Sequence, residues 1–301
     1  MRHFSDPAQV QHAPLRELHN GGWMDFAESP ARFEAILDTL GPGEPARDFG
    51  IEPILAVHDP AYVAFLREAH DLWRAAGREG DAMGYVFPVR GRRPLDLERI
   101  DAKIGAFAMD ASTPVAAGTW ASAYGAAQSA LTALDAVLGG EQMAFALCRP
   151  PGHHCGADYM GGYCYLNNAA IAARAAQARG IGRVAILDVD YHHGNGTQDI
   201  FYADGEVLFA SIHADPKTDY PFYWGHADER GEGAGEGAAA RGGAARGALR
   251  QRAQRVGVLA VEVELRRRVE AAQALLLRRE PARPRWTPLM SVSASKVRYH
   301  E

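Results

Sequence analysis

The stretch Arg183–Gly196, RVAILDVDYHHGNG, gives the clearest indication of the fold. Its first part, Val184–Val189, is a short apolar run rich in β-branched residues, which is typical of a strand buried on both faces of a parallel sheet. Asp188, Asp190 and His192 follow at intervals of two, and side chains two apart in an extended segment point to the same side. Two carboxylates and an imidazole therefore converge where the strand ends, as in a metal site. The alternative is an ordinary buried strand with a polar end, and two acids and two histidines within six residues argue against it.

Two other predicted strands also end in histidine. Residues 143–147 (MAFAL) lead directly into CRPPGHHC, where a proline pair stiffens the turn and His153 and His154 emerge. Val207–His213 (VLFASIH) is a further strand with a histidine at its end. Helix-length segments separate the strands, so the sequence predicts a doubly wound parallel α/β sheet, in which ligands bind beyond the carboxyl ends of the strands. All three polar clusters fall at that edge.

Four helices are expected from their capping residues and apolar spacing. The first starts at Pro30 after Ser29 and stops at Gly41, and an alanine-rich helix covers Trp120–Leu138. Another runs from Asn167 or Asn168 to Gly180. The remaining helix starts at Pro60 after the Asp59 cap, and its buried face is predicted to consist of Phe65, Leu66, Leu72 and Trp73.

Three segments are expected to be non-helical. Residues 51–57 read as a short strand, and residues 193–196 (HGNG) as a second imidazole followed by a flexible turn. Residues 77–94 are rich in Gly and Arg without a clean period, which predicts a loop. That loop is either a surface connection or a functional rim or oligomer contact.

Length and composition indicate a globular protein. With 301 residues, 47% of them hydrophobic, the chain can bury a full core, and one large α/β domain fits as well as two small ones. The N-terminus lacks an apolar core of signal-peptide length and no later segment approaches a membrane span, so we expect a cytoplasmic protein without membrane contact. Cys148, Cys155 and Cys164 lack zinc-knuckle spacing and are odd in number, which predicts reduced thiols near the site.

The net charge of −5 conceals a division along the chain. Residues 238–301 contain thirteen Arg and one Lys against five Glu, a formal charge of +9, which leaves −14 for residues 1–237. An acidic body attracts a cationic substrate by long-range steering, although acidic surfaces also serve solubility.

Several long motifs in the same order resemble the zinc-dependent histone deacetylase superfamily: RPPGHH, GGYCYLNNAA, DVDYHHGNGTQ and GHADERGEG. Within it, residues 100–118 and the Asn of HHGNG are most similar to bacterial acetylpolyamine amidohydrolases. The resemblance covers residues 1–237 and implies the arginase/deacetylase α/β fold. It also implies a zinc-dependent hydrolase that removes acetyl groups from acetylated polyamines or acetyl-lysine, and a homodimer in which residues 77–94 narrow the entrance to the site.

The resemblance assigns catalytic roles to four residues. His153 and His154 match the tandem catalytic histidines. Asp188 matches the group that orients the first histidine, and Asn195 stands where a partner of the second is found. A carboxylate partner and an amide partner should separate the two pKa values, which supports split acid and base roles. A double histidine by itself could equally be a satisfied core or loop pair.

The resemblance also assigns binding residues. Asp190 and His192 match two zinc ligands, and Gly162 and Tyr163 match the aromatic wall of the acyl-lysine tunnel. Asp188 and Ser211 match a structural site for a monovalent cation, K⁺ or Na⁺.

The chain departs from the family pattern after Gly237. The family takes a third zinc ligand from a later Asp and an oxyanion-stabilising Tyr from a later Gly-Gly-Tyr loop, but no Asp follows Asp228, and the one later Tyr, Tyr299, has no glycine pair before it. Thirteen Ala and thirteen Arg among residues 238–301 are what an out-of-frame reading of a GC-rich gene would give. We therefore interpret this tail as a frameshift product or an unrelated segment, outside a deacetylase-like domain of residues 1–237.

The tail leaves other interpretations open. Residues 256–263 could form a strand and residues 265–279 a basic amphipathic helix, and the arginines could bind nucleic acid, although interleaved aromatic residues and a recognisable module are missing. The leading hypothesis is an amidohydrolase for acetylated cationic amines. The alternative is a catalytically impaired remnant of that family without the third zinc ligand and the oxyanion Tyr.

Overall fold

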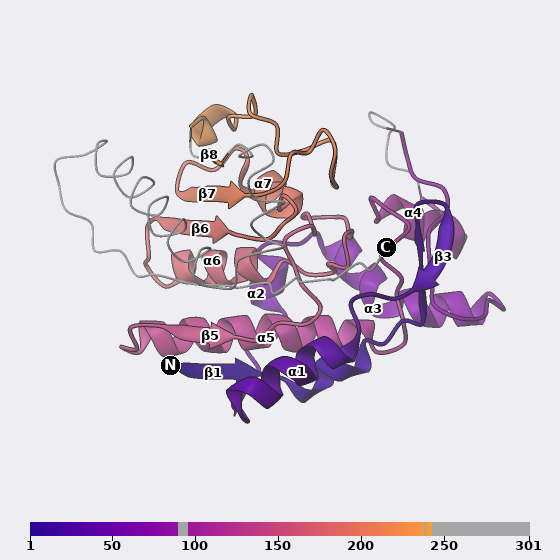
Figure 1. The fold of residues 1–301 in the computed structure, drawn as a ribbon, viewed down its shortest axis with the longest axis horizontal. Coiled ribbons are helices and arrows are strands. Elements are labelled where there is room, and N and C mark those ends of the chain that lie inside the picture. Colours follow the sequence, from indigo (N-terminus) through magenta and orange to yellow (C-terminus); the bar gives the residue numbers. More distant parts are fainter. Residues whose placement is uncertain (90–95, 238, 243–301) are drawn as a thin grey trace, which may run out of the picture.

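Parallel strands in two groups of three form the frame of the fold (Figure 1). The computed structural model describes residues 1–89, 96–237 and 239–242. In the first group, β1 (Arg2–Ser5) lies between β4 (Glu44–Pro45) and β5 (Ala144–Ala146). In the second, β7 (Val207–Ile212) lies between β6 (Val184–Asp188) and β8 (Ala239–Gly242). The predicted parallel α/β class is confirmed, with the described strands arranged as two groups.

Helices α5 (Thr119–Leu138) and α6 (Asn168–Ala178) join the two groups. Helix α5 packs against β1 and β5, α6 packs against β6, and the two helices pack against each other. Helix α1 (Pro30–Leu40) lies beside the 3-10 helix Pro7–Gln11, and α2 (Glu52–Leu55) packs against α6. Helix α3 (Pro60–Ala75) contacts α4 (Ile100–Ala106), while α7 (Asn195–Phe201) contacts β7. A second 3-10 helix spans Gly233–Gly235.

The predicted caps of the helices are confirmed where proline follows a cap residue. Ser29 precedes α1, and Gly41, with φ 78°, ends it. The Asp59 carboxylate accepts hydrogen bonds from the backbone N–H groups of Ala61 and Tyr62 and so satisfies the first turn of α3. Asn167 caps α6 in the same way.

Three expectations about burial and local structure are wrong. Residues 51–57 contain helix α2 because Pro53 suits a first helical turn but lacks the N–H that a strand needs. Leu72 is 36% exposed, since the last turn of α3 runs past the core that covers Phe65 and Leu66. Only Val184 of β6 is fully buried, because β7 is the only described strand paired with β6.

The antiparallel hairpin of β2 (Arg16–His19) and β3 (Gly22–Asp25) was not expected. Its two-residue turn has Asn20 at φ 50° and Gly21 at φ 79°, which is the left-handed conformation that an Asn-Gly hairpin turn requires. The Asn-Gly pair was the available sequence signal. The hairpin carries Glu17 toward the functional site.

One further expectation is confirmed, and others concern residues that the structure does not describe. Residues 77–89 form a loop, as predicted, and Ala82 is bridged to Val115. Residues 90–94 of the expected loop and the tail segments 256–263 and 265–279 lie outside the described residues. In the described part of the chain, none of the helices combines the length and the apolar character that a membrane crossing requires.

Arg149 fixes the N-terminal segment to the loop that follows β5. Its buried guanidinium donates to the carbonyls of Gln9 (2.5 Å), His12 (2.6 Å) and Glu28 (2.7 Å), and its Nε donates to Glu28 Oε1 at 3.1 Å. The backbone N–H of Arg149 also donates to the Gln9 side chain. The loop that presents His153 is thereby tied to the first 28 residues.

We expect Arg149→Met to lower the free energy of unfolding by about 3–5 kcal/mol, because it leaves the Glu28 carboxylate and three carbonyls buried without their donor. Urea unfolding followed by circular dichroism measures the loss. Arg2→Met is the matched control, since the Arg2–Glu44 pair is half exposed and should contribute less than about 1 kcal/mol. Equal effects of the two substitutions would contradict the structural role of Arg149.

Candidate active site

The ends of β6 and β7 and the loop that follows β5 come together, as predicted, because His153 of that loop contacts Asp188 of β6, which pairs with Ser211 of β7. Asp188 is the last residue of β6 and pairs in register with Ser211 on β7. Beyond Asp188 the backbone is no longer extended. The N–H of Asp190 donates to Asp188 Oδ1 at 3.0 Å, and the N–H of His192 donates to Asp190 Oδ1 at 2.8 Å. Two successive tight turns therefore bring these side chains together, instead of the strand alternation that the sequence suggested.

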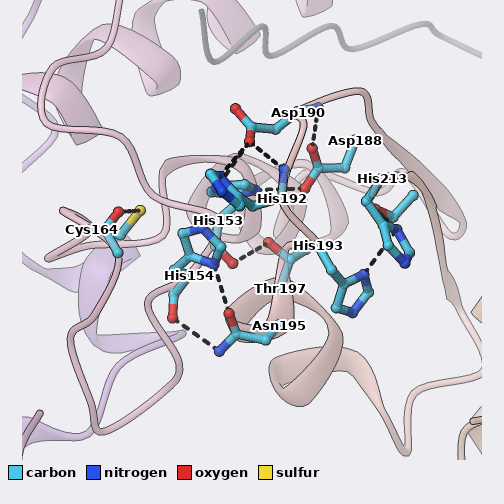
Figure 2. Close-up of polar contacts among 12 residues, drawn as sticks. His153, His154, Cys164, Asp188, Asp190, His192, His193, Asn195, Thr197 and His213 are labelled. Atoms are coloured by element: carbon cyan, nitrogen blue, oxygen red, sulfur yellow. Dashed lines mark hydrogen bonds and ion pairs between the residues drawn. The ribbon is translucent and has the colours of Figure 1, made fainter. Parts of the chain in front are cut away.

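His153 is held by the acids at the end of β6 (Figure 2). Its Nδ1 lies 2.9 Å from Asp188 Oδ2, and its Nε2 lies 3.9 Å from Asp190 Oδ1. Burial by itself lowers the pKa of His153, but the two carboxylates outweigh it and raise this pKa to about 9. His153 is thus a cation at neutral pH in the metal-free chain.

His154 is held by an amide. Its Nδ1 lies 2.7 Å from Asn195 Oδ1, while Asn195 Nδ2 faces the hydroxyl of Tyr159 at 3.2 Å. This orientation of the amide places a proton on Nδ1 of His154 and leaves Nε2 as the acceptor. Burial, followed by the charge of His153, lowers the pKa of His154 well below its usual value. The predicted separation of the two histidine pKa values therefore follows from the geometry.

Asp190 and His192, the two expected zinc ligands, lie close together. His192 Nδ1 lies 3.6 Å from Asp190 Oδ1, and a carboxylate with an imidazole is a donor set that zinc accepts. Zinc sites in enzymes usually have three protein ligands. Among the described residues, however, no group of three or more His, Cys, Asp or Glu side chains is arranged to hold a metal ion. The described chain thus supplies two ligands that fit zinc in kind.

Residues 193–196 are not the flexible turn that the sequence suggested, because α7 begins at Asn195. The glycines permit close packing. A Cβ on Gly194 would lie 2.3 Å from Asp188 Oδ2, and one on Gly196 would lie 2.2 Å from the carbonyl oxygen of Cys155. The His193 imidazole turns away from His153 to lie beside His213, with 3.3 Å between their Nδ1 atoms.

Ser211 lies close to Asp188 through the β6–β7 register, and its hydroxyl is 2.8 Å from Nδ1 of His213. This placement brings together the two residues expected to hold a monovalent cation. Cation binding itself stays a prediction.

The Gly162–Tyr163 pair lies against His154. Both residues have positive φ, 52° and 67°, and a Cβ on Gly162 would be 2.2 Å from Cδ2 of His154. The Tyr163 hydroxyl donates to Glu17 Oε1 at 2.8 Å, and its ring meets Phe26 edge to face. Gly162 therefore packs against His154, with Tyr163 next to it in the chain, and the role of these two residues as a wall of the substrate tunnel stays a prediction.

Sequence reasoning missed Tyr220 as a site residue. Its ring meets the His154 ring edge-on, with 4.9 Å between centroids, and the His192 ring at 5.7 Å. Its hydroxyl donates to Asp110 Oδ2 at 2.8 Å. In the sequence Tyr220 precedes Pro221, and this local pattern gives no sign that the ring reaches the histidines.

The three cysteines are free thiols, as expected. Cys155 follows His154 directly, and Cys164 Sγ lies 3.3 Å from the carbonyl oxygen of Gly162. Burial raises the pKa of the Cys148 thiol to about 12 and that of Cys155 further, so both remain protonated at neutral pH.

Comparison with known proteins agrees with this geometry. The family model for the histone deacetylase domain matches residues 26–255. The chain belongs to the histone deacetylase family. Membership in this family makes it a deacetylase or amidohydrolase by class.

Relatives within the histone deacetylase family include acetylpolyamine amidohydrolase 2 of Pseudomonas aeruginosa, 48% identical over 78% of this chain and 69% of the relative. The acetylpolyamine amidohydrolase of Mycoplana ramosa is 44% identical over 79% of this chain and 71% of its own. The crystal structure of the acetylpolyamine aminohydrolase from Burkholderia pseudomallei superposes with a TM-score of 0.76 at 45% identity, covering 81% of this chain and 72% of that one. The fold class is thereby shown to be that of the deacetylases.

We expect Gly162→Ala to displace His154 and to destabilise the chain by about 1–3 kcal/mol, because it combines positive-φ strain with a clash against the ring. Gly21→Ala is the matched control: φ is 79° there, but nothing lies within 4 Å of the added methyl group. Only Gly162→Ala should shift the His154 ring signals in NMR spectra. Unchanged His154 signals in a folded Gly162→Ala chain would contradict this packing.

Proposed function

We propose that this chain hydrolyses the acetyl amide of small acetylated cationic amines of the polyamine type, with zinc between Asp190 and His192. The observation that carries the proposal is the pairing of His153 with a carboxylate and His154 with an amide beside those two ligands. A zinc ion held there would supply Lewis acidity to the acetyl carbonyl and to the attacking water.

The two histidines divide the proton transfers. Nε2 of His154 is an acceptor, because Asn195 fixes the proton on Nδ1, so this histidine takes the proton of the attacking water. His153 is held through Nδ1 by the Asp188 carboxylate, and as an imidazolium it would return a proton from Nε2 to the departing amine. A donor to the tetrahedral oxyanion is not among the residues assigned to the site.

Glu17 supports a cationic substrate. Its side chain is buried on β2, Oε1 accepts the hydroxyl of Tyr163, and Oε2 lies 3.4 Å from the N–H of Ala27. Burial raises its pKa. A protonated amine of the polyamine, beyond its acetylated end, would pair with the Glu17 carboxylate and so offset the free-energy cost of burying that charge. The acidic charge of residues 1–237 acts in the same direction at longer range.

The impaired-remnant hypothesis also has a specific basis. The sequence contains no Asp after Asp228, and the described residues supply two zinc ligands. Loss of one oxyanion donor alone commonly reduces kcat on the order of 100-fold or more. The remnant would retain the folded histidine pairs without turnover.

Metal analysis and hydrolysis of an acetylated diamine by the full chain separate the two hypotheses. An active enzyme should bind stoichiometric zinc, and His153→Ala should lower kcat by about 100-fold or more. His70→Ala, a histidine substitution in α3, is the matched control and should retain activity. Absence of turnover in a folded, zinc-loaded wild-type chain would reject the hydrolase and favour the remnant.

The substrate class has its own test. We expect Glu17→Gln to raise the KM of an acetylated diamine about 10-fold, equivalent to about 1.4 kcal/mol of lost binding, with little change for an uncharged N-alkylacetamide. Glu141→Gln is the control, because that carboxylate pairs with Arg2 near β1. An equal change for both substrates would remove Glu17 from cation recognition.

A further inference from the structure

The Asp110 carboxylate collects four hydrogen bonds in the loop between α4 and α5. Oδ2 accepts from the N–H of Gly162 at 2.7 Å and from the hydroxyl of Tyr220 at 2.8 Å. Oδ1 accepts from the N–H of Ser112 at 3.1 Å and from the hydroxyl of Thr113 at 2.8 Å. Four donors from three separate parts of the chain therefore meet at one side chain.

The loop that carries Asp110 is itself fixed to the segment before Gly162. The N–H of Met109 donates to the carbonyl of Met160 at 2.9 Å, and the N–H of Met160 donates to the carbonyl of Phe107 at 2.8 Å. Asp110 thus reaches Gly162 from a backbone that is already bonded to the neighbouring residues. The Asp110 carboxylate therefore has little freedom to turn toward other hydrogen-bond donors.

The Tyr220 ring and the Gly162–Tyr163 backbone, which both lie against His154 or directly beside its contact, depend on these bonds. Tyr163 follows Gly162, and its N–H donates to Thr113 Oγ1 at 3.1 Å, so its backbone is held through a residue that Asp110 also binds. Tyr220 meets His154 edge-on and is held directly through its hydroxyl. One carboxylate accordingly sets the positions of two rings that come from segments more than fifty residues apart in sequence.

We propose that Asp110 is a positioning residue that holds Tyr220 and the Gly162–Tyr163 backbone in place around His154 and thereby sets the surface that the acetylated amine meets there. The substrate part of this inference rests on the proposed function, and the positioning part does not. A carboxylate is required because two oxygens can accept four hydrogen bonds. An asparagine offers one acceptor oxygen and adds an N–H₂ group that would face donors.

A fluorine label tests the positioning directly. We expect 3-fluorotyrosine introduced at position 163 of the full chain to give a different or broadened ¹⁹F NMR signal when Asp110→Asn is added. Asp48→Asn is the matched control, because Asp48 also accepts a tyrosine hydroxyl, that of Tyr124, at 2.5 Å. It should leave the signal at position 163 unchanged. An unchanged signal in a folded Asp110→Asn chain, or an equal change with Asp48→Asn, overturns the inference.

Tyr220→Phe keeps the test decisive if Asp110→Asn does not fold, because it removes one hydrogen bond and adds no donor. It should shift the label at position 163 less than Asp110→Asn does. A folded Tyr220→Phe chain with an unchanged signal overturns the coupling of the two rings.

Kinetics provide the second readout. Asp110→Asn should raise the KM of an acetylated diamine about 10-fold and change kcat less than about 3-fold, since it disturbs the walls of the pocket and leaves the histidine partners in place. Tyr220→Phe should have no further effect in the Asp110→Asn background, because the same bond is already lost. An active Asp110→Asn enzyme with unchanged KM overturns the inference. A wild-type chain without turnover refutes the proposed function alone, and the fluorine signals still decide the positioning.

Discussion

The Asp188 carboxylate is the interaction on which the site depends. Its Oδ2 holds Nδ1 of His153, and its Oδ1 accepts the N–H of Asp190, so one side chain joins the loop after β5 to the turns after β6. The position of Asp188 is fixed by the parallel register of β6 with β7, which pairs it with Ser211. Gly194 must lack a side chain because a Cβ would lie 2.3 Å from this carboxylate. The pairing of β6 with β7 therefore fixes the orientation of the His153 imidazole.

A second set of contacts holds the loop that carries His153 and His154. The first turn of α7 binds the loop of the histidine pair, as the N–H of Thr197 donates to the carbonyl of His153 at 3.0 Å. Arg149 fixes the start of the same loop to the N-terminal segment. The histidine pair is thus held from both ends. Such support matters because catalytic groups need their geometry established before substrate arrives.

The described residues combine two histidines held by different partners with two further side chains, Asp190 and His192, of the kinds that zinc accepts. Burial lowers the pKa of both histidines, but the carboxylates beside His153 outweigh it and raise that pKa, whereas burial and the charge of His153 lower the pKa of His154. Asp190 and His192, the residues expected to bind zinc, lie next to this pair. The arrangement accords with membership in the histone deacetylase family, whose domain model matches residues 26–255. The hydrogen bonds that hold the two rings, from His153 to Asp188 and from His154 to Asn195, lie within residues 153–195.

The parallel α/β class, the helix caps and the pairing of His153 and His154 with Asp188 and Asn195 can be predicted from the sequence alone. Those features depend on local spacing and on several motifs that occur in family order. Several features could not be predicted from local patterns and depend on the packing of the chain. They are the helix at residues 52–55, the partial exposure of β6, the start of α7 at Asn195, and the approach of Tyr220 and Glu17 to the site. These depend on contacts between segments far apart in sequence. The deciding distances, such as 4.9 Å between the Tyr220 and His154 rings, arise only when the packed elements bring such segments together.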